Sequence, residues 1–166
     1  MNFTSKSHYA LKIMLDLAYY YYLPHVHRKD VAKRQHIPVD YLDQIMIKLR
    51  ASGLVKSIRG RGGGYRLSND PKNVTIWDVV TAVENNIGPV DCTNQDSCNH
   101  ETFCISTNAW KEIFKEVKHI LTSKTLYSVV EKWKESGKML EDMNKNELSQ
   151  ESKNIENVVE AVNNLA

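Results

Sequence analysis

The chain has 166 residues, of which 42% are hydrophobic and 25% are charged. This length is enough for one domain of ordinary size with an appendage and too short for two full enzymatic domains. Residues 1–70 carry 12 Lys and Arg against 5 Asp and Glu, whereas residues 71–166 carry 10 against 15. This asymmetry favours a polyanionic partner for the amino-terminal half. Charges interrupt the first apolar residues and no run of about 18 apolar residues occurs, so we expect a cytoplasmic protein that makes no use of a membrane.

The first 52 residues predict a helix followed by a helix-turn-helix unit. Residues 5–23 place apolar side chains at helical spacing and end at Pro24, which favours a core helix. Its stripe is Ala10, Ile13, Met14, Leu17 and Tyr21. A short helix over 28–35, a tight turn at 36–38 and a second helix over 39–52 follow. This order of helix, turn and helix is typical of DNA-binding proteins.

The second helix of this unit has a polar face that is free to read bases. Its core stripe is Leu42, Ile45, Met46 and Leu49. Tyr41, Gln44 and Lys48 fall within about 60° of one another on a different face. Gln can bond adenine, Lys guanine or phosphate, and Tyr phosphate or a thymine methyl. The pattern also fits a solvated helix surface, and the neighbouring Asp40 and Asp43 would either repel phosphate or accept a hydrogen bond from cytosine.

A basic, glycine-rich hairpin follows. Residues 54–59 alternate like a strand, the glycine-rich segment 60–64 turns the chain, and residues 65–67 return. Glycines allow positive φ at the tip, and Arg59 and Arg61 can enter a minor groove. An exposed turn with solvated arginines is the alternative. After a helix-turn-helix, the hairpin predicts a mainly α winged helix-turn-helix fold with a small β-hairpin wing.

The second half of the chain predicts further helices around a polar loop. Residues 75–86 read as a helix, and a shorter apolar pattern spans 126–133. The loop 87–104 has no hydrophobic period, so a bound metal would be needed to order it. The long helix 105–122 carries enough apolar surface to expect a partner helix, most simply its own copy in a homodimer.

The polar loop contains the only cysteines of the chain, Cys92, Cys98 and Cys104, with five residues between neighbours. Thiolates suit iron-sulfur clusters or zinc, and an odd count in a reducing compartment argues against a disulfide framework. Structural zinc sites usually contain close Cys pairs, which are absent here; zinc and three free thiols remain the alternatives to a cluster. A cluster would need a fourth ligand, for which histidine is the best chemical choice. The candidates are His8, Asp91, Asp96, His100, Glu101, Thr107 and Asn108.

Four motifs together resemble one protein family. They are the Thr-Ser-Lys-Ser-His-Tyr-Ala start at 4–10, Tyr-Leu-Asp-Gln at 41–44, Arg-Gly-Arg-Gly-Gly-Gly-Tyr at 59–65, and the evenly spaced cysteine triplet. Over about residues 1–135 the chain resembles the Rrf2-type, iron-sulfur-sensing winged-helix regulators, the family of IscR and NsrR. The resemblance implies a homodimer with a long dimerisation helix and a cluster at the dimer edge that controls transcription. It places Cys92, Cys98 and Cys104 on iron, and Tyr41, Gln44 and Arg59 on DNA.

The chain departs from the family pattern at the fourth ligand. IscR-like members carry a histidine three residues after the third cysteine, where this chain has Thr107. In nitric-oxide-sensing members the partner protomer donates a carboxylate near the eighth residue, where this chain has His8. Our hypothesis is that His8 of the partner protomer completes the site.

The sequence therefore predicts a transcriptional regulator, a repressor, that binds a pseudo-palindromic promoter site in double-stranded DNA. Its DNA contacts would be Tyr41, Gln44, Lys48, Arg59 and Arg61. Its cofactor would be a 2Fe-2S cluster, with 4Fe-4S as the second choice. A zinc-stabilised winged-helix repressor and an iron-sulfur carrier are the alternatives. No acid/base pair or nucleophile arrangement is visible, so an enzyme is not expected.

The expected organisation has two parts. The regulator domain spans 1–135, with the DNA-binding part at 1–70, the cluster loop at 87–104 and the dimerisation helix at 105–122. A polar and flexible tail spans 136–166.

Overall fold

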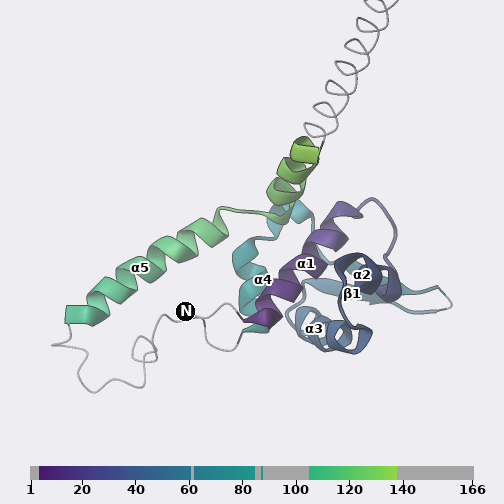
Figure 1. Cartoon of the computed structure of the whole chain (residues 1–166), viewed down its shortest axis with the longest axis horizontal. Coiled ribbons are helices and arrows are strands. Elements are labelled where there is room, and N and C mark those ends of the chain that lie inside the picture. Colours follow the sequence, from purple (N-terminus) through teal and green to yellow (C-terminus); the bar gives the residue numbers. More distant parts are fainter. Residues whose placement is uncertain (1–3, 61, 85–86, 88–104, 138–166) are drawn as a thin grey trace, which may run out of the picture. The chain divides into compact units, whose positions relative to one another are not determined.

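The computed structural model describes residues 4–60, 62–84, 87 and 105–137 of the chain (Figure 1). The chain divides into two compact units, Met1–Val130 and Glu131–Ala166. The elements of the first unit, in chain order, are α1 (Ser5–Tyr19), α2 (Arg28–Gln35), α3 (Val39–Ala51), β1 (Val55–Ile58), β2 (Gly64–Leu67), the 3-10 helix η1 (Pro71–Asn73), α4 (Ile76–Val83) and α5 (Ile105–Thr122). Residues 126–137 are also helical. In the second unit, Lys134 Nζ lies 3.0 Å from the Glu131 carboxylate.

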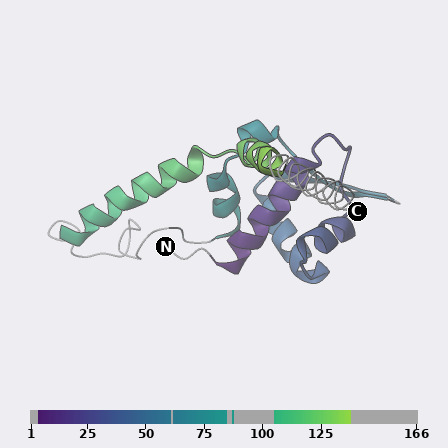
Figure 2. The same ribbon diagram turned by 45° about the horizontal axis from the view of Figure 1, so that its top comes forward.

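Helix α1 is the centre of the first unit, with α4 on one side and α2 and α3 on the other (Figure 2). Thr4 caps its start by accepting a hydrogen bond from the Lys6 N–H. The predicted stripe from Ala10 to Leu17 is buried, but the helix ends at Tyr19 and Tyr21 is 46% exposed. The expectation of a helix to residue 23 was wrong, because the chain turns before Pro24, whose ring disfavours helical backbone at the preceding residue.

The helix-turn-helix has the predicted position and a specific turn. His36 ends α2 in the left-handed conformation, at φ 53° and ψ 49°. The Ile37 N–H then donates to the Ala32 carbonyl at 2.9 Å, and the Ile37 side chain is buried. This closes the helix end, and Pro38 leads directly into α3.

An ion pair between a buried carboxylate of α1 and a partly exposed guanidinium of α2 joins the two helices. The Asp16 carboxylate accepts hydrogen bonds from Arg34 Nε and Nη2 at 2.9 and 2.7 Å and from Gln35 Nε2 at 2.9 Å. The hydrogen bond to Asp16 raises the pKa of Arg34 above its ordinary value, although burial lowers it. Because the Asp16 carboxylate is buried, loss of its partners would leave an uncompensated charge between the two helices.

The second half of the first unit closes onto α4. Thr75 and Asp78 form a reciprocal capping box at the start of α4, which ends at Val83 and not at residue 86 as predicted. The turn after α5 pairs with the start of α4, where the Ile76 N–H donates to the Lys124 carbonyl at 2.8 Å. Leu126 and Val130 of the following helix are buried in the core. These elements confirm the mainly α winged helix-turn-helix fold. Within the part of the chain that the structure describes, no helix is long and apolar enough to cross a membrane.

Candidate functional site

Helix α3 presents an exposed surface that we name the outward face of α3. It consists of Asp40, Gln44, Ile47 and Ala51, all of which are exposed. These residues lie opposite the buried stripe of the same helix, since both sets follow the helical repeat of about 3.6 residues. The buried stripe packs α3 onto the core, so the outward face is the surface that the fold leaves available to a large partner.

Two of the predicted DNA-contact residues lie to one side of this face. The rings of Tyr41 and Tyr9 meet edge to face with centroids 5.4 Å apart. Lys48 Nζ donates to the Val83 carbonyl at 2.8 Å and thereby caps the end of α4. Both side chains are half-buried, whereas Gln44 is exposed. Tyr41 and Lys48 therefore contact α1 and α4, whereas the neighbouring Gln44 is exposed to solvent.

An ion pair compensates one acidic residue on α3. Arg28 Nη1 lies 2.6 Å from Asp43 Oδ2, and the Arg28 side chain is about half exposed. Exposed pairs of this kind contribute little to stability. Their effect here is local, because the guanidinium reduces the repulsion that the Asp43 carboxylate would exert on a phosphate.

The wing is held by the segment that precedes α2. Strands β1 and β2 are antiparallel, with Val55 opposite Leu67 and Ile58 opposite Gly64. Val26 adds a bridge to Tyr65 through two backbone hydrogen bonds of 2.8 Å. This isolated bridge ties β2 of the hairpin to the segment that precedes α2.

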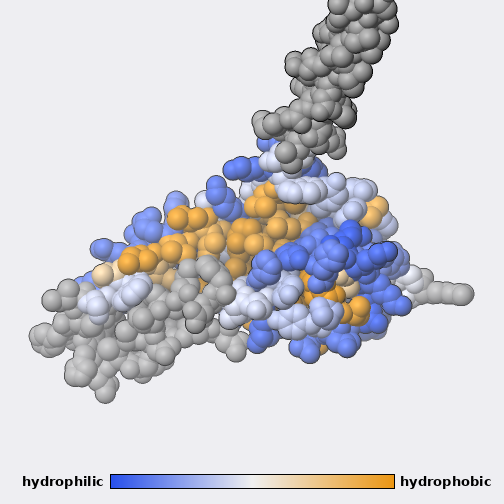
Figure 3. Space-filling view, in the orientation of Figure 1, coloured by the Kyte–Doolittle hydropathy of each residue, from blue (hydrophilic) through white to orange (hydrophobic). Residues whose placement is uncertain are grey.

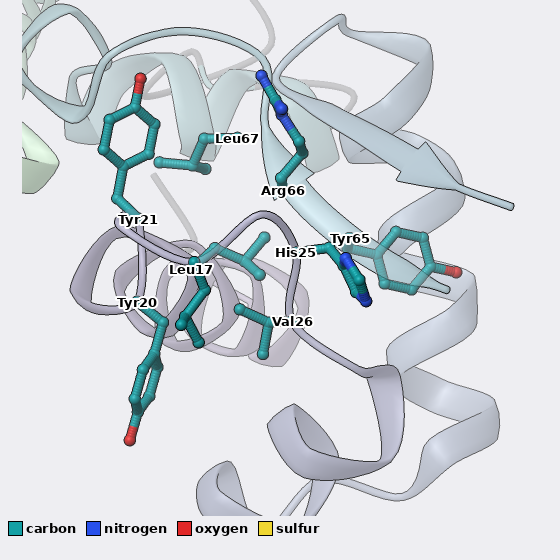
Figure 4. A pocket seen from close by; sticks show the side chains of 9 residues that line it. Leu17, Tyr20, Tyr21, His25, Val26, Tyr65, Arg66 and Leu67 are labelled. Carbon is teal, nitrogen blue, oxygen red and sulfur yellow. The ribbon is translucent and has the colours of Figure 1, made fainter. Parts of the chain in front are cut away.

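Two histidines reinforce this anchor, and no motif in the sequence marked them as functional. His25 Nε2 donates to the Gly62 carbonyl at 2.5 Å, and His27 Nδ1 donates to the Gly63 carbonyl at 2.8 Å. Figure 4 shows His25 beside Tyr65 in a small cleft between the end of α1 and β2. The cleft measures about 200 Å³, below the roughly 300–1,000 Å³ typical of small-molecule sites. It is a packing junction that supports the wing.

A test of this anchor is Gly64→Ala. A Cβ at Gly64 would lie 2.2 Å from the Val26 carbonyl oxygen, which is backbone and cannot rotate away. We expect the substitution to reduce the free energy of unfolding by about 1–3 kcal/mol, as overpacking does, and to weaken DNA binding. Urea denaturation and a gel shift measure the two effects. Gly53→Ala is the control for the stability effect alone, since its Cβ meets nothing within 4 Å and its cost arises from a positive φ of 72°. DNA affinity equal to that of Gly53→Ala would show that the wing anchor has no part in binding.

The start of α1 and the end of α4 are joined where the chain enters the cysteine loop. The backbone N–H and the hydroxyl of Thr4 donate to Glu84 Oε1 at 3.3 and 2.5 Å. Burial raises the pKa of Glu84, but hydrogen bonds from Thr4 and Ser7 lower it by more, so it lies below the ordinary value of 4.5. The carboxylate is therefore charged at neutral pH. His8, one turn further along α1, is exposed, and its ring meets that of Tyr9 edge to face with centroids 5.4 Å apart.

Most of the residues that the sequence suggests as metal ligands lie outside the described residues. This applies to Cys92, Cys98 and Cys104, to the candidate ligands Asp91, Asp96, His100 and Glu101, and also to Arg61. Among the residues that the structure describes, no three His, Cys, Asp or Glu side chains gather as a metal site. The donor set itself fits a cluster, since three thiolates and one imidazole supply four ligands.

Helix α5 carries a long apolar stripe. Phe114 packs on Trp77 of α4 with ring centroids 5.8 Å apart, and Lys118 lies over the same Trp77 ring at 5.3 Å. Trp110, Ile113 and Ile120 are 40%, 51% and 56% exposed on α5. Figure 3 shows hydrophobic residues gathered in a band along this helix. Part of the stripe thus packs within the chain, and part of it is uncovered.

Comparisons with known proteins agree with this arrangement. Residues 3–132 match the family model Rrf2, an iron-dependent transcriptional regulator. The HTH-type transcriptional regulator IscR of Vibrio campbellii is 36% identical over 126 residues, which cover 76% of this chain and 75% of that protein. The structure of T. potens IscR has a TM-score of 0.68 and 29% identity, covering 82% of this chain and 90% of that one. The structure of CymR, the global cysteine regulator of B. subtilis, has a TM-score of 0.66 and 31% identity, covering 79% of this chain and 97% of that one.

The fold, the outward face of α3 and the basic wing define a winged-helix, DNA-binding transcriptional regulator, and not an enzyme. The chain belongs to the Rrf2 family. Family membership confirms the predicted class of protein and removes the alternative of an iron-sulfur carrier.

Proposed function

We propose that this regulator is a homodimeric repressor that binds a pseudo-palindromic promoter site and whose DNA affinity depends on an iron-sulfur cluster. The carrying observation is the contact between Thr4 and Glu84, at 3.3 and 2.5 Å. It ties the entrance of the cysteine loop to the first turn of α1, which bears the exposed His8. Changes in the loop are thus mechanically linked to the helix that packs against α3.

For DNA binding, α3 would lie in the major groove and the wing beside it, as in other winged-helix proteins. Gln44 is best placed for a base, because it is exposed on the outward face. Lys48 would have to exchange its 2.8 Å hydrogen bond to Val83 for a DNA contact. We assign Tyr41, Lys48, Arg59 and Arg61 to the sugar-phosphate backbone and the minor groove, where contacts determine position more than sequence.

For the cluster, Cys92, Cys98 and Cys104 would supply the thiolates and His8 of the other protomer the fourth ligand. A 2Fe-2S cluster is our first choice and 4Fe-4S the second. When bound, the cluster supplies a redox-active group whose non-thiolate position exchanges most readily. Within one protomer, the His8 ring meets Tyr9 edge to face and Tyr9 meets Tyr41 in the same way, with ring centroids 5.4 Å apart in each pair. This aromatic row connects the proposed ligand directly to α3.

A zinc-stabilised repressor is the remaining alternative, and protein purified without oxygen distinguishes the two. A cluster gives visible absorption together with iron and acid-labile sulfide. Colourless protein that contains zinc and no sulfide would establish a structural metal.

The wing assignment is tested by Arg59→Ala in a salt-dependent gel shift. If Arg59 reads a groove, its removal should cost about 1–3 kcal/mol of binding free energy per half-site. Arg61→Ala should mainly lower the salt slope, by roughly one unit, as loss of a phosphate contact does. Lys115→Ala, which removes an exposed cation from α5, is the control. If both wing variants have the same DNA affinity and salt dependence as this control, the wing has no part in DNA binding.

A further inference from the structure

Ile47 is an unusual residue for the outward face of α3. It is 65% exposed, the greatest exposure of any large hydrophobic side chain on α2, α3 or the wing strands. It follows Gln44 by three residues and precedes Ala51 by four, so it lies on the same line of the helix. The surface that faces away from the core therefore has an apolar centre.

On the side of β1, Ile47 borders a groove with two basic residues, whereas Asp43 lies one helical turn before it. An open groove of about 650 Å³ lies between α3 and β1. Its lining includes Ile47, Arg50 and Ala51 from α3, and Lys56 and Ile58 from β1. None of its lining residues is acidic, and the side chains of Arg50 and Lys56 are exposed. An apolar floor between two cations suits a polyanion that presents an apolar group between its phosphates.

Double-stranded DNA has one such group. In the major groove the C5-methyl of thymine is the apolar feature that distinguishes it from the other bases. An isoleucine reads a methyl by contact, while Arg50 and Lys56 would neutralise phosphates on either side. We propose that Ile47 is a specificity-determining residue that recognises a thymine methyl in each half-site. This inference rests on the proposed placement of α3 in the major groove.

The spacing of Ile47 and Gln44 specifies where that thymine lies. Three residues advance a helix by about 4.5 Å, and successive bases of one strand are about 3.4 Å apart. Gln44 and Ile47 therefore meet neighbouring base pairs. Since Gln pairs best with adenine, the half-site should contain an adenine read by Gln44 with a methyl-bearing thymine on an adjacent pair.

The test replaces single thymines by uracil, which removes only the methyl. The probe is a duplex selected from random double-stranded DNA by the full-length chain, and each thymine is exchanged in turn. With the unmodified chain, one position per half-site should lose about fourfold in affinity, the value of one buried methyl-sized group. With Ile47→Ala, the affinity for the thymine duplex should fall by a similar factor, and uracil at that position should have no further effect.

Two controls make the outcome decisive. Ile58→Ala removes the isoleucine on the other side of the groove and should leave the uracil profile unchanged. Gln44→Ala and Arg59→Ala test the docking itself. If neither weakens binding, the proposed docking and the role of Ile47 both fail. If these two variants do weaken binding, three results would still rule out the role of Ile47. These are no loss of affinity from uracil at any thymine, a loss that persists in Ile47→Ala, and a loss that disappears in Ile58→Ala.

Discussion

Ile113→Glu should dissociate the proposed homodimer into monomers and weaken promoter binding sharply. Ile113 is 51% exposed on the apolar stripe of α5 in the single chain. In the proposed dimer the partner helix would cover this position, and a glutamate carboxylate there would be buried without a partner of opposite charge. Phe114 is a poorer choice, because it packs on Trp77 within the chain. Since a dimer binds its second half-site as an intramolecular event, monomers should bind on the order of 100-fold more weakly or worse.

Sedimentation and a gel shift on the same preparation measure both effects. Lys115→Glu is the matched control, since it introduces the same side chain on the polar side of α5, where Lys115 is exposed. It should stay dimeric and keep most of its affinity. A dimer that survives Ile113→Glu would place the interface elsewhere on the molecule.

Cys92→Ala should abolish the visible chromophore, and His8→Ala should change it. A cluster that loses one of three thiolates has too few ligands to persist, whereas loss of the weaker imidazole leaves a labile or spectrally shifted cluster. Cys92 lies outside the described residues, but His8 is exposed in the first turns of α1 and its removal should leave the core intact. Anaerobic absorption spectra and the lifetime of the cluster in air measure these effects.

His100→Ala is the control for His8→Ala. It removes the other histidine considered as a ligand and should change little. The fourth ligand would be His100 and not His8 if His8→Ala leaves the absorption spectrum and the cluster lifetime unaltered while His100→Ala changes one of them. Melting temperatures of all three variants show whether folding has changed.

The core of the fold could be predicted from the sequence, because burial imposes a strict helical period. Leu42, Ile45, Met46 and Leu49 repeat at that period and all four are buried. The wing was predictable for another reason: strand alternation flanks a run of glycines. The ends of helices were predicted less accurately, as the observed ends at Tyr19 and Val83 show, because capping and turn contacts determine where a helix stops.

The outward face of α3 was harder to predict from the sequence. Polarity selected Tyr41, Gln44 and Lys48, but Tyr41 and Lys48 have partners on α1 and α4 that only the packing of distant segments creates. The position opposite the core stripe was the available signal, and it includes the apolar Ile47. His25 and His27 had no such signal, because their partners are backbone carbonyls of the wing.

If the cluster sets the affinity for DNA, removing it from one preparation should change that affinity. The same anaerobic preparation is titrated with its selected operator duplex before and after removal of the cluster, at one salt concentration. We expect visible absorption with iron and sulfide at the start, and a changed affinity for the duplex once the iron and sulfide are gone. In Tyr9→Leu, which interrupts the row between His8 and Tyr41, that change should shrink. Equal affinities of the loaded and cluster-free protein would contradict the account.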